Sequence, residues 1–471
     1  MIFENFSFKK QDKMSQDLFQ EFEEVTAKQW KQKIQFDLKG EDYNEKLIFK
    51  SRDGINVKPF YNAEDISENA NIHHPKSWEI CGKIYVASAA KSNKNAIESL
   101  KKGTESLWFI IPSEKTSINI LLQNLPLEET PIYLSFEFLS EEFIQKINQF
   151  LDGKKHKIRL QIDIVGNLAR SGNWYQNLNQ DHKNLSKIVS EAKKFNSVLS
   201  VDATLYQNAG ATIPQELAYA LAHSNEYLNY FNSSKESLAE LEMQFLTASG
   251  SNYFFEIAKI QALRLLYASL ASEYNLPETC HILAQPTKRD KTLYDFNVNL
   301  LRTTGQSMSA ILGGANAIYN IPYDSIYQKN NDFGDRIARN QLLVLKNESY
   351  FDKVSNAAEG AYYIESLTTQ FAEKALEIFK EIEQGGGFLK QLKEGIIQQK
   401  ISESAQKEQE QFNKGELVLI GTNKHKNPKD KMKNNLELYP FLKMNPRKTL
   451  ISPILERRLS EKLEQERIEK E

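Results

Sequence analysis

Short β-rich segments alternate with amphipathic helical segments along much of this chain. Most of the β-rich segments are near-continuous runs of apolar or β-branched residues, which is typical of parallel strands buried on both faces. Eight such segments are expected to form strands: Lys83–Ala87, Ser106–Ile111, Ile132–Phe136, Ile158–Ile164, Val198–Asp202, Glu242–Ala248, His281–Gln285 and Ala310–Ile318. Eight strands that alternate with helices predict an α/β fold, a closed (β/α)8 TIM barrel, with an open doubly wound sheet as the alternative.

Three regions are expected from the pattern along the chain. Residues 1–65 are charged and helix-like, with scattered aromatic anchors such as Phe22 and Trp30, and predict an N-terminal arm. Residues 66–385 hold the barrel, and its last helix, Leu367–Glu383, is expected to stop at Gly385–Gly387. Residues 386–471 are mostly polar and predict a helical C-terminal extension without a second large domain.

The charge balance and the cysteine count exclude several classes of protein. Lys and Arg number 60 and Asp and Glu 62, so the net charge of −2 gives no long-range field toward nucleic acid or an anionic membrane. No apolar run approaches the ~20 residues of a membrane span, and the segment Met1–Glu4 does not open a secretory signal. Cys81 and Cys280 cannot form a disulfide framework or a cysteine zinc site. We therefore expect a soluble, cytoplasmic protein.

Few residues suggest a site on spacing alone. None of the 7 histidines has the spacing of a metal-binding motif. Gly313 and Gly314 are expected at a strand end, where they would serve either close approach of a ligand or tight packing.

Four charged residues have two readings each. Asp202 and Asp290 lie near the ends of expected strands, where a barrel carries catalytic groups, but capping of the next helix or bonding to loop amides is the favoured interpretation. Arg336 and Arg339 could bind phosphate, yet three residues apart on a helix they more often form solvated ion pairs. The residues alone therefore predict a large barrel and no recognisable set of catalytic residues.

A series of short segments, each weak alone, is specific in its order and spacing over about residues 25–425. The segments are Trp30, Leu38–Gly40, Lys46–Leu47, Asp53–Ile55, Val57–Tyr61, Gln207–Ala211, Gln215–Tyr219, Tyr253–Lys259, Gly313–Gly314, Arg336–Asn340 and Val418–Asn423. Together they resemble the methylmalonyl-CoA mutase family, in particular its small, non-catalytic (beta) subunits.

The resemblance implies a fold and a chemistry. In catalytic chains of the family, a (β/α)8 barrel threads the acyl-CoA arm through its centre, and a flavodoxin-like domain with a D-x-H-x-x-G motif holds cobalamin. The reaction is a radical isomerisation between methylmalonyl-CoA and succinyl-CoA.

Several positions that match the catalytic pattern carry other residues in this chain. Lys83 stands in the place of an active-site tyrosine, Cys81 in that of a CoA-binding arginine, and Leu205 in that of a histidine on the substrate carbonyl. The cofactor-facing positions are Gln306, Asn316 and Tyr319. No D-x-H-x-x-G motif occurs, and the region after Lys426 is too short for a complete cobalamin-binding domain.

The resemblance thus implies a small subunit without catalytic residues, metal or cofactor of its own, inactive alone. It would stabilise a homologous catalytic chain in a heterodimer of propionate metabolism, and that partner would hold adenosylcobalamin. Two alternatives remain: the barrel subunit of a split acyl-CoA mutase whose cobalamin domain lies on another chain, and a stand-alone CoA-binding scaffold. Whether this barrel still binds acyl-CoA stays an open question.

Overall fold

The computed structural model describes residues 25–66, 72–192, 194–234, 242–442 and 446–471, in two compact units. The first unit ends at Glu68. Its elements are α2 (Ala27–Asp37), α3 (Tyr43–Leu47), the antiparallel pair β1 (Phe49–Lys50) and β2 (Asn56–Val57), and η2 (Ala63–Asp65). Helix α2 starts at a capping box between Thr26 and Gln29, and Trp30 packs edge to face on Phe60.

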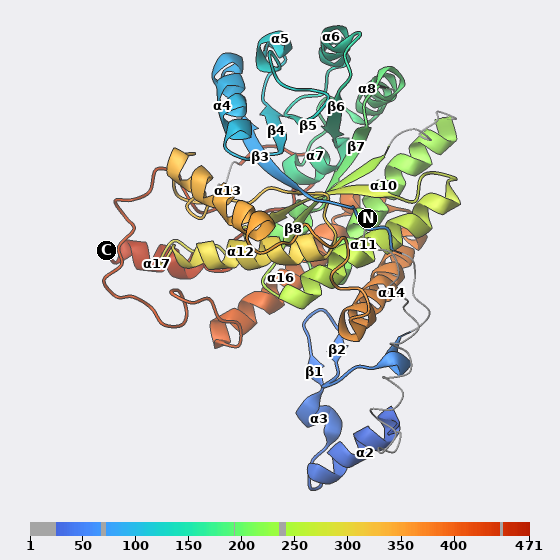
Figure 1. Ribbon diagram of the computed structural model, residues 1–471, viewed down its shortest axis with the longest axis vertical. Coiled ribbons are helices and arrows are strands. Elements are labelled where there is room, and N and C mark those ends of the chain that lie inside the picture. Colours follow the sequence, from blue (N-terminus) through green and yellow to red (C-terminus); the bar gives the residue numbers. More distant parts are fainter. Residues whose placement is uncertain (1–24, 67–71, 193, 235–241, 443–445) are drawn as a thin grey trace, which may run out of the picture. The chain divides into compact units, whose positions relative to one another are not determined.

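The second unit begins at Asn69 and contains a closed barrel of eight parallel strands, which confirms the predicted TIM barrel (Figure 1). The strands, which follow one another around the barrel in chain order, are β3 (Glu79–Tyr85), β4 (Ser106–Ile111), β5 (Pro131–Phe136), β6 (Lys157–Ile162), β7 (Ser197–Asp202), β8 (Met243–Ser249), β9 (Cys280–Pro286) and β10 (Ala317–Ile318). The short β10 closes the barrel by pairing with both β9 and β3.

One predicted strand, Ala310–Ile318, is largely wrong. Its first residues belong to the end of α12 (Val298–Leu312), where Ala310 and Ile311 are buried, and only Ala317–Ile318 is a strand. The apolar run is therefore the buried face of a helix that ends at Gly313, followed by a short strand.

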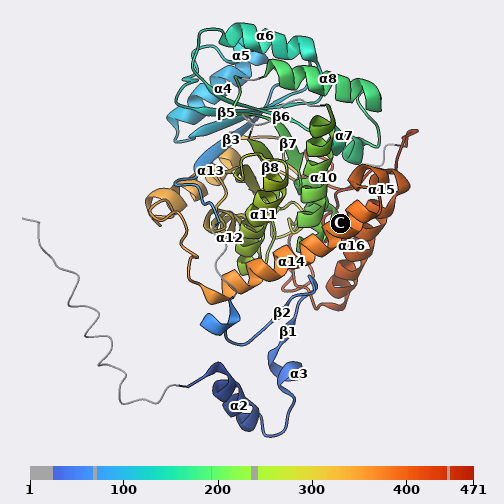
Figure 2. The same ribbon diagram turned by 90° about the vertical axis from the view of Figure 1, so that its right-hand side faces the viewer.

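Helices surround the barrel (Figures 1 and 2). They are α4 (Ala89–Lys101), α5 (Ile118–Leu121), α6 (Glu141–Leu151), α7 (Ile164–Ser171), α8 (Leu178–Glu191), α9 (Thr204–Ala209), α10 (Ile213–Ser234), α11 (Tyr253–Glu273), α12, α13 (Asp332–Asn347) and α14 (Tyr362–Gln384). Helix α14 packs on α10 and α11 and ends at Gly385, as predicted. No helix of the described residues is both long and apolar enough to span a membrane.

A buried ion-pair cluster joins α10 to α11. The Lys259 ammonium lies 3.0 Å from Glu216 and 2.6 Å from Glu256, and it also donates to the Ala248 carbonyl. Burial alone would lower the pKa of Lys259, but the two carboxylates raise it above its ordinary value. The cluster therefore carries its charge inside the protein.

The chain after the barrel returns to the loops that follow the barrel strands. It forms α15 (Phe388–Glu394), α16 (Ile396–Lys414) and α17 (Glu461–Glu469). The backbone N–H groups of Leu450 and Ile454 donate to carbonyls of Gly172 and Ala169 at the end of α7. Farther along, Leu459 N–H donates to the Arg289 carbonyl, in the loop after β9. We call residues 446–464 the mouth segment, because they bind at the carboxyl ends of the strands.

Candidate functional site

The barrel axis is closed by a cluster of interlocked side chains. Tyr133 donates or accepts a hydrogen bond of 2.8 Å with His281 Nε2, and its hydroxyl lies 3.2 Å from Glu79 Oε2. All three point inward from β5, β9 and β3. Tyr133 also belongs to a packed cluster with Cys81, Trp108, Leu246, Leu283 and Ala317. We call these residues together the axial plug.

Burial sets the protonation of the axial plug. Desolvation lowers the pKa of His281 well below its ordinary value, helped by the charges of Arg159 and Arg264. Desolvation also raises the pKa of Glu79 and raises that of the Cys81 thiol to about 12. The imidazole and the thiol are therefore neutral at physiological pH.

Above the axial plug, a cavity of about 540 Å³ lies at the carboxyl ends of the strands. We call it the mouth cavity. Its lining combines the aromatic side chains of Tyr85, Trp108, Phe136, Phe138 and Tyr175 with polar and charged groups from β3, β6, β7 and the loop after β9. Trp108 and Leu246 belong both to this lining and to the axial plug, so the cavity ends where the plug begins.

Lys83 enters the mouth cavity from β3. Its ammonium nitrogen lies 3.8 Å from the centre of the Trp108 ring and 5.4 Å from that of Tyr319. The pKa of Lys83 is lowered to about 7, mainly by desolvation; the charges of Lys288 and Arg170 act in the same direction, whereas Asp202 opposes them. The amine is therefore poised between its two protonation states near neutral pH.

The other positions that the resemblance singles out do not line this cavity; Tyr319 packs edge to face on Trp108 and lines the second cavity described below. Leu205 is buried in α9 and does not line the mouth cavity. Gln306 bonds Asp290 and Lys291 through its two amide atoms. Asn316, just before β10, accepts from Arg264 and from the Ile282 N–H.

The two aspartates differ. Asp202 lines the mouth cavity, accepts from the Thr204 N–H, and pairs with Arg170 at 2.7 Å. This fits the favoured reading, in which it holds the start of the next helix. Asp290 instead pairs with Lys291 at 2.6 Å and accepts from Ser251, so capping is not its role among the contacts described.

Gly313 and Gly314 do not lie at the active-site end that was expected for them. They precede β10, at the amino end of the barrel, and follow α12. A Cβ at Gly313 would meet the Ile257 carbonyl at 2.9 Å, and Gly314 adopts a φ of +91° against the His74 ring. Of the two readings, tight packing is the one that their positions support.

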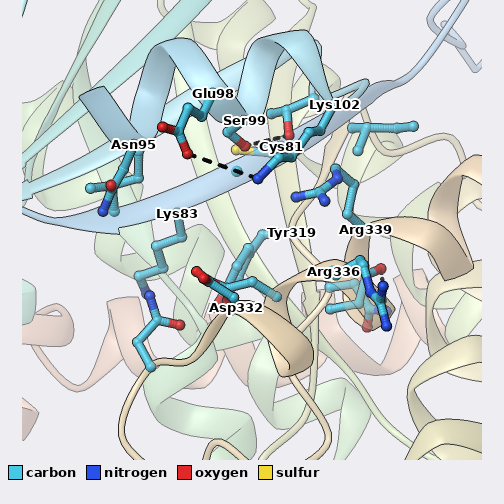
Figure 3. A pocket seen from close by; sticks show the side chains of 18 of the residues that line it. Cys81, Lys83, Asn95, Glu98, Ser99, Lys102, Tyr319, Asp332, Arg336 and Arg339 are labelled. Carbon is cyan, nitrogen blue, oxygen red and sulfur yellow. Dashed lines mark hydrogen bonds and ion pairs between the residues drawn. The ribbon is translucent and has the colours of Figure 1, made fainter. Parts of the chain in front are cut away.

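A second cavity, of about 600 Å³, lies at the seam between β3–α4 and β10–α13 (Figure 3). Arg336 and Arg339 line it from α13, opposite Glu98 and Lys102 of α4. The expected ion pairs are not found: among the described residues neither arginine lies within 4 Å of a carboxylate, and Arg336 instead contacts the Phe333 ring. Within the same residues no group of histidine, cysteine or acidic side chains is arranged to hold a metal ion.

Sequence reasoning missed the axial plug and the polar groups beside Lys83. Trp108 Nε1–H donates to Ser135, and Ser135 donates to Gln161 Oε1. The signal available was the presence of large polar or aromatic residues inside expected strands, but the inward face of each strand was needed to interpret it.

Comparisons with known proteins agree on one protein family. Residues 110–465 match the family model described as methylmalonyl-CoA mutase. The chain is 32% identical to the methylmalonyl-CoA mutase small subunit of Porphyromonas gingivalis, over 88% of this chain and 72% of that protein. It is 26% identical to the methylmalonyl-CoA mutase of Rhizobium meliloti, over 86% of this chain and 64% of that protein. It is 31% identical to the large subunit from P. gingivalis, over 52% of this chain and 35% of that protein.

Proposed function

The chain belongs to the methylmalonyl-CoA mutase family, and we propose that it is the small, non-catalytic subunit of a heterodimeric methylmalonyl-CoA mutase. In this proposal it pairs with a homologous catalytic chain, stabilises that chain, and works in the cytoplasm in propionate metabolism. The complex interconverts methylmalonyl-CoA and succinyl-CoA. The printed names of the P. gingivalis relatives, a small and a large subunit, support two different chains.

The observation that carries the proposal is the axial plug. A catalytic barrel of this kind needs an open axis for the acyl-CoA arm, as the family resemblance implies. Here the Tyr133 hydroxyl hydrogen-bonds both His281 and Glu79 across that axis, and the cluster around Trp108 fills the space above them. Opening this path would cost both hydrogen bonds and packing, because each large buried side chain contributes several kcal/mol (about 3–5 for an aromatic one).

The residues present do not fit a cobalamin site. Gln306 and Asn316 use their amide groups for hydrogen bonds inside the protein, and Leu205 is buried without a donor to offer. The mouth segment covers loops at the carboxyl ends of the strands, where a cofactor would approach the substrate. In our proposal adenosylcobalamin is therefore held by the partner chain.

The test is reconstitution with a catalytic chain. We expect this chain alone, supplied with adenosylcobalamin and methylmalonyl-CoA, to show no turnover above the buffer control. Co-expression with a large subunit of the family should yield a 1:1 complex on size-exclusion chromatography. The complex should retain activity after heating that inactivates the large subunit alone. Robust turnover by the isolated chain would contradict the proposal.

The same preparations separate the two alternatives. Turnover after adding a separate cobalamin-binding chain, without a second barrel, would support the split mutase. Absence of a complex at micromolar concentrations, together with CoA binding by calorimetry, would support the scaffold. We expect no CoA binding by the isolated chain, because the axial plug closes the path of the arm.

A further inference from the structure

Arg336 and Arg339 are neighbours on α13, and neither has a bonded acid. Among the described residues no ion pair joins either guanidinium to a carboxylate, and the buried Arg339 Nε has no hydrogen-bond acceptor there. Burial lowers the pKa of Arg339; Asp335 opposes this, and the charge of Arg336 acts in the same direction as burial. Two cations at this helical spacing repel one another, so an anion bound to both would stabilise them.

The cavity beside this pair exists because β10 is short. It is the cavity of about 600 Å³ between β3–α4 and β10–α13, which we call the seam cavity. β10 pairs with β3 only at Glu79 and Ile80, whereas β3 continues to Tyr85. The Glu79 N–H donates toward β10, to the Asn316 carbonyl, and the alternation of a strand turns the Lys83 N–H the same way. Backbone donors without a described strand partner therefore border the seam cavity.

The side chains that line the seam cavity include both signs of charge. The cations are Lys83, Lys102, Arg336 and Arg339, and the acids are Glu98, Asp332 and Asp335. Glu98 faces two lysines, at 3.9 Å from Lys102 and 4.0 Å from Lys94.

The other two acids belong to the first turn of α13. Asp332 and Asp335 lie there, where the N–H groups of a helix start favour carboxylates. Burial raises the pKa of Asp335 to about 6, which weakens it as a permanent counter-charge for Arg339. The guanidinium groups of the two arginines are therefore the cations of the seam cavity that still lack a bonded anion.

We propose that the seam cavity binds a phosphate group between Arg336 and Arg339, with Lys102 on the opposite wall (Figure 3). Each guanidinium presents a planar fork of N–H donors that matches two phosphate oxygens. Positions three apart on a helix are about 5–6 Å apart at Cβ, so one phosphate can contact both forks. The volume leaves room for the body of a small phosphomonoester as well. The site lies within this chain and does not rest on the proposed function.

Calorimetry on the full chain with inorganic phosphate, at constant ionic strength, tests the proposal. We expect saturable binding with a Kd below about 5 mM. Arg336→Met and Arg339→Met should each weaken phosphate binding about tenfold or more, because each removes charge-assisted hydrogen bonds. Lys94→Met, at an exposed lysine of α4 that does not line the seam cavity, is the control and should bind as the unmodified chain does.

Glycerol 3-phosphate separates the two sources of a phosphate group. Binding that is at least about tenfold tighter than that of inorganic phosphate would support a phosphomonoester as the ligand. Equal affinity of the two would support free phosphate at the same pair of arginines.

Modification by phenylglyoxal, read by mass spectrometry, locates the site on the unmodified chain. Phosphate at about ten times its Kd should slow modification of Arg336 about tenfold. The exposed Arg447 lies outside the seam cavity and should react at an unchanged rate.

Circular dichroism checks that each variant is folded, and the exposed position of Arg336 makes Arg336→Met the safer of the two. Phosphate binding that is unchanged in folded Arg336→Met and Arg339→Met would overturn the proposal. So would the absence of saturable binding, or competition by chloride as strong as that by phosphate. Equal protection of Arg336 and Arg447 from phenylglyoxal would have the same meaning.

Discussion

Lys83 shows what one position on a barrel strand can determine. Its place on β3 aims an amine into the mouth cavity, above the Trp108 ring, with the cations Lys288 and Arg170 in the same lining. The charged and titratable groups that face it are Lys288, Arg170, Asp202 and Cys81, and Asp163, Glu137, Glu456 and Tyr319 lie around the same space. The net effect, led by desolvation, is a pKa of about 7 instead of 10.5.

This shift predicts a pH dependence of stability. Below pH 7 Lys83 is charged in both the folded and the unfolded chain, and the cost of the buried charge is fully present. Between pH 7 and about 10.5 the folded chain loses the proton first, so that cost declines as pH rises. Lys83→Met should therefore raise Tm most below pH 7, and its advantage should shrink toward pH 10. Calorimetric scans from pH 6 to 9.5 measure this, with Lys94→Met as the control; a difference that does not vary with pH would contradict it.

Single residues also mark the limit of sequence reasoning. The family pattern drew attention to Lys83, and the structure places it in the mouth cavity. The same pattern gave no sign of Tyr133 and His281, because a residue 148 positions away becomes a hydrogen-bond partner only when the strands close into a barrel. Strand alternation predicts two faces, but not which one turns inward when both are buried.

At the scale of elements, the alternation of strands and helices predicted the barrel. Seven expected strands overlap β3 to β9, and most are the apolar or β-branched runs typical of parallel strands buried on both faces. The prediction of a strand at Ala310–Ile318 failed because a short apolar run fits a buried helix end equally well. Gly313 marks the end of that helix inside the run. Long-range ion pairs such as Lys259 with Glu216 left no local signal.

The packing of α10 on α11 depends on that buried ion-pair cluster. Lys259→Met should remove the cation that lies between the buried carboxylates of Glu216 and Glu256 and lower the free energy of unfolding by about 3–5 kcal/mol. Urea unfolding followed by circular dichroism measures the change. Lys94→Met, which removes an exposed pair with Glu98, should change stability by less than about 0.5 kcal/mol. Equal effects of the two variants would show that the buried cluster contributes no more than a surface pair.

At the scale of the whole second unit, the mouth segment ties late residues to early loops. Arg458 is its anchor: the guanidinium donates to the Lys291 and Pro440 carbonyls and pairs with Glu464 at 2.6 Å. Glu464 is fully buried, and it accepts from the Leu293 N–H as well. The anchor thus connects α17 to the loop after β9.

Loss of this anchor should release the mouth segment without unfolding the barrel. In Arg458→Met we expect hydrogen exchange to speed up about 10²-fold in residues 450–469, the size set by ~3 kcal/mol for an uncompensated buried carboxylate. Amides of β4 and β5 should exchange at unchanged rates. Lys462→Met, at an exposed position of α17, is the control. Protection that stays the same in Arg458→Met would show that other contacts hold the segment.

The mouth segment also fixes an order of events during synthesis. Leu450 bonds Asn173, 277 positions earlier, so this contact cannot form until the barrel and its following helices have left the ribosome. Ribosomes add about 5–20 residues per second, and more than a hundred residues separate β10 from Leu450, so the delay is on the order of ten seconds. A nascent barrel therefore waits without the mouth segment on its loops, and binding of that segment is the last and most non-local step of its folding.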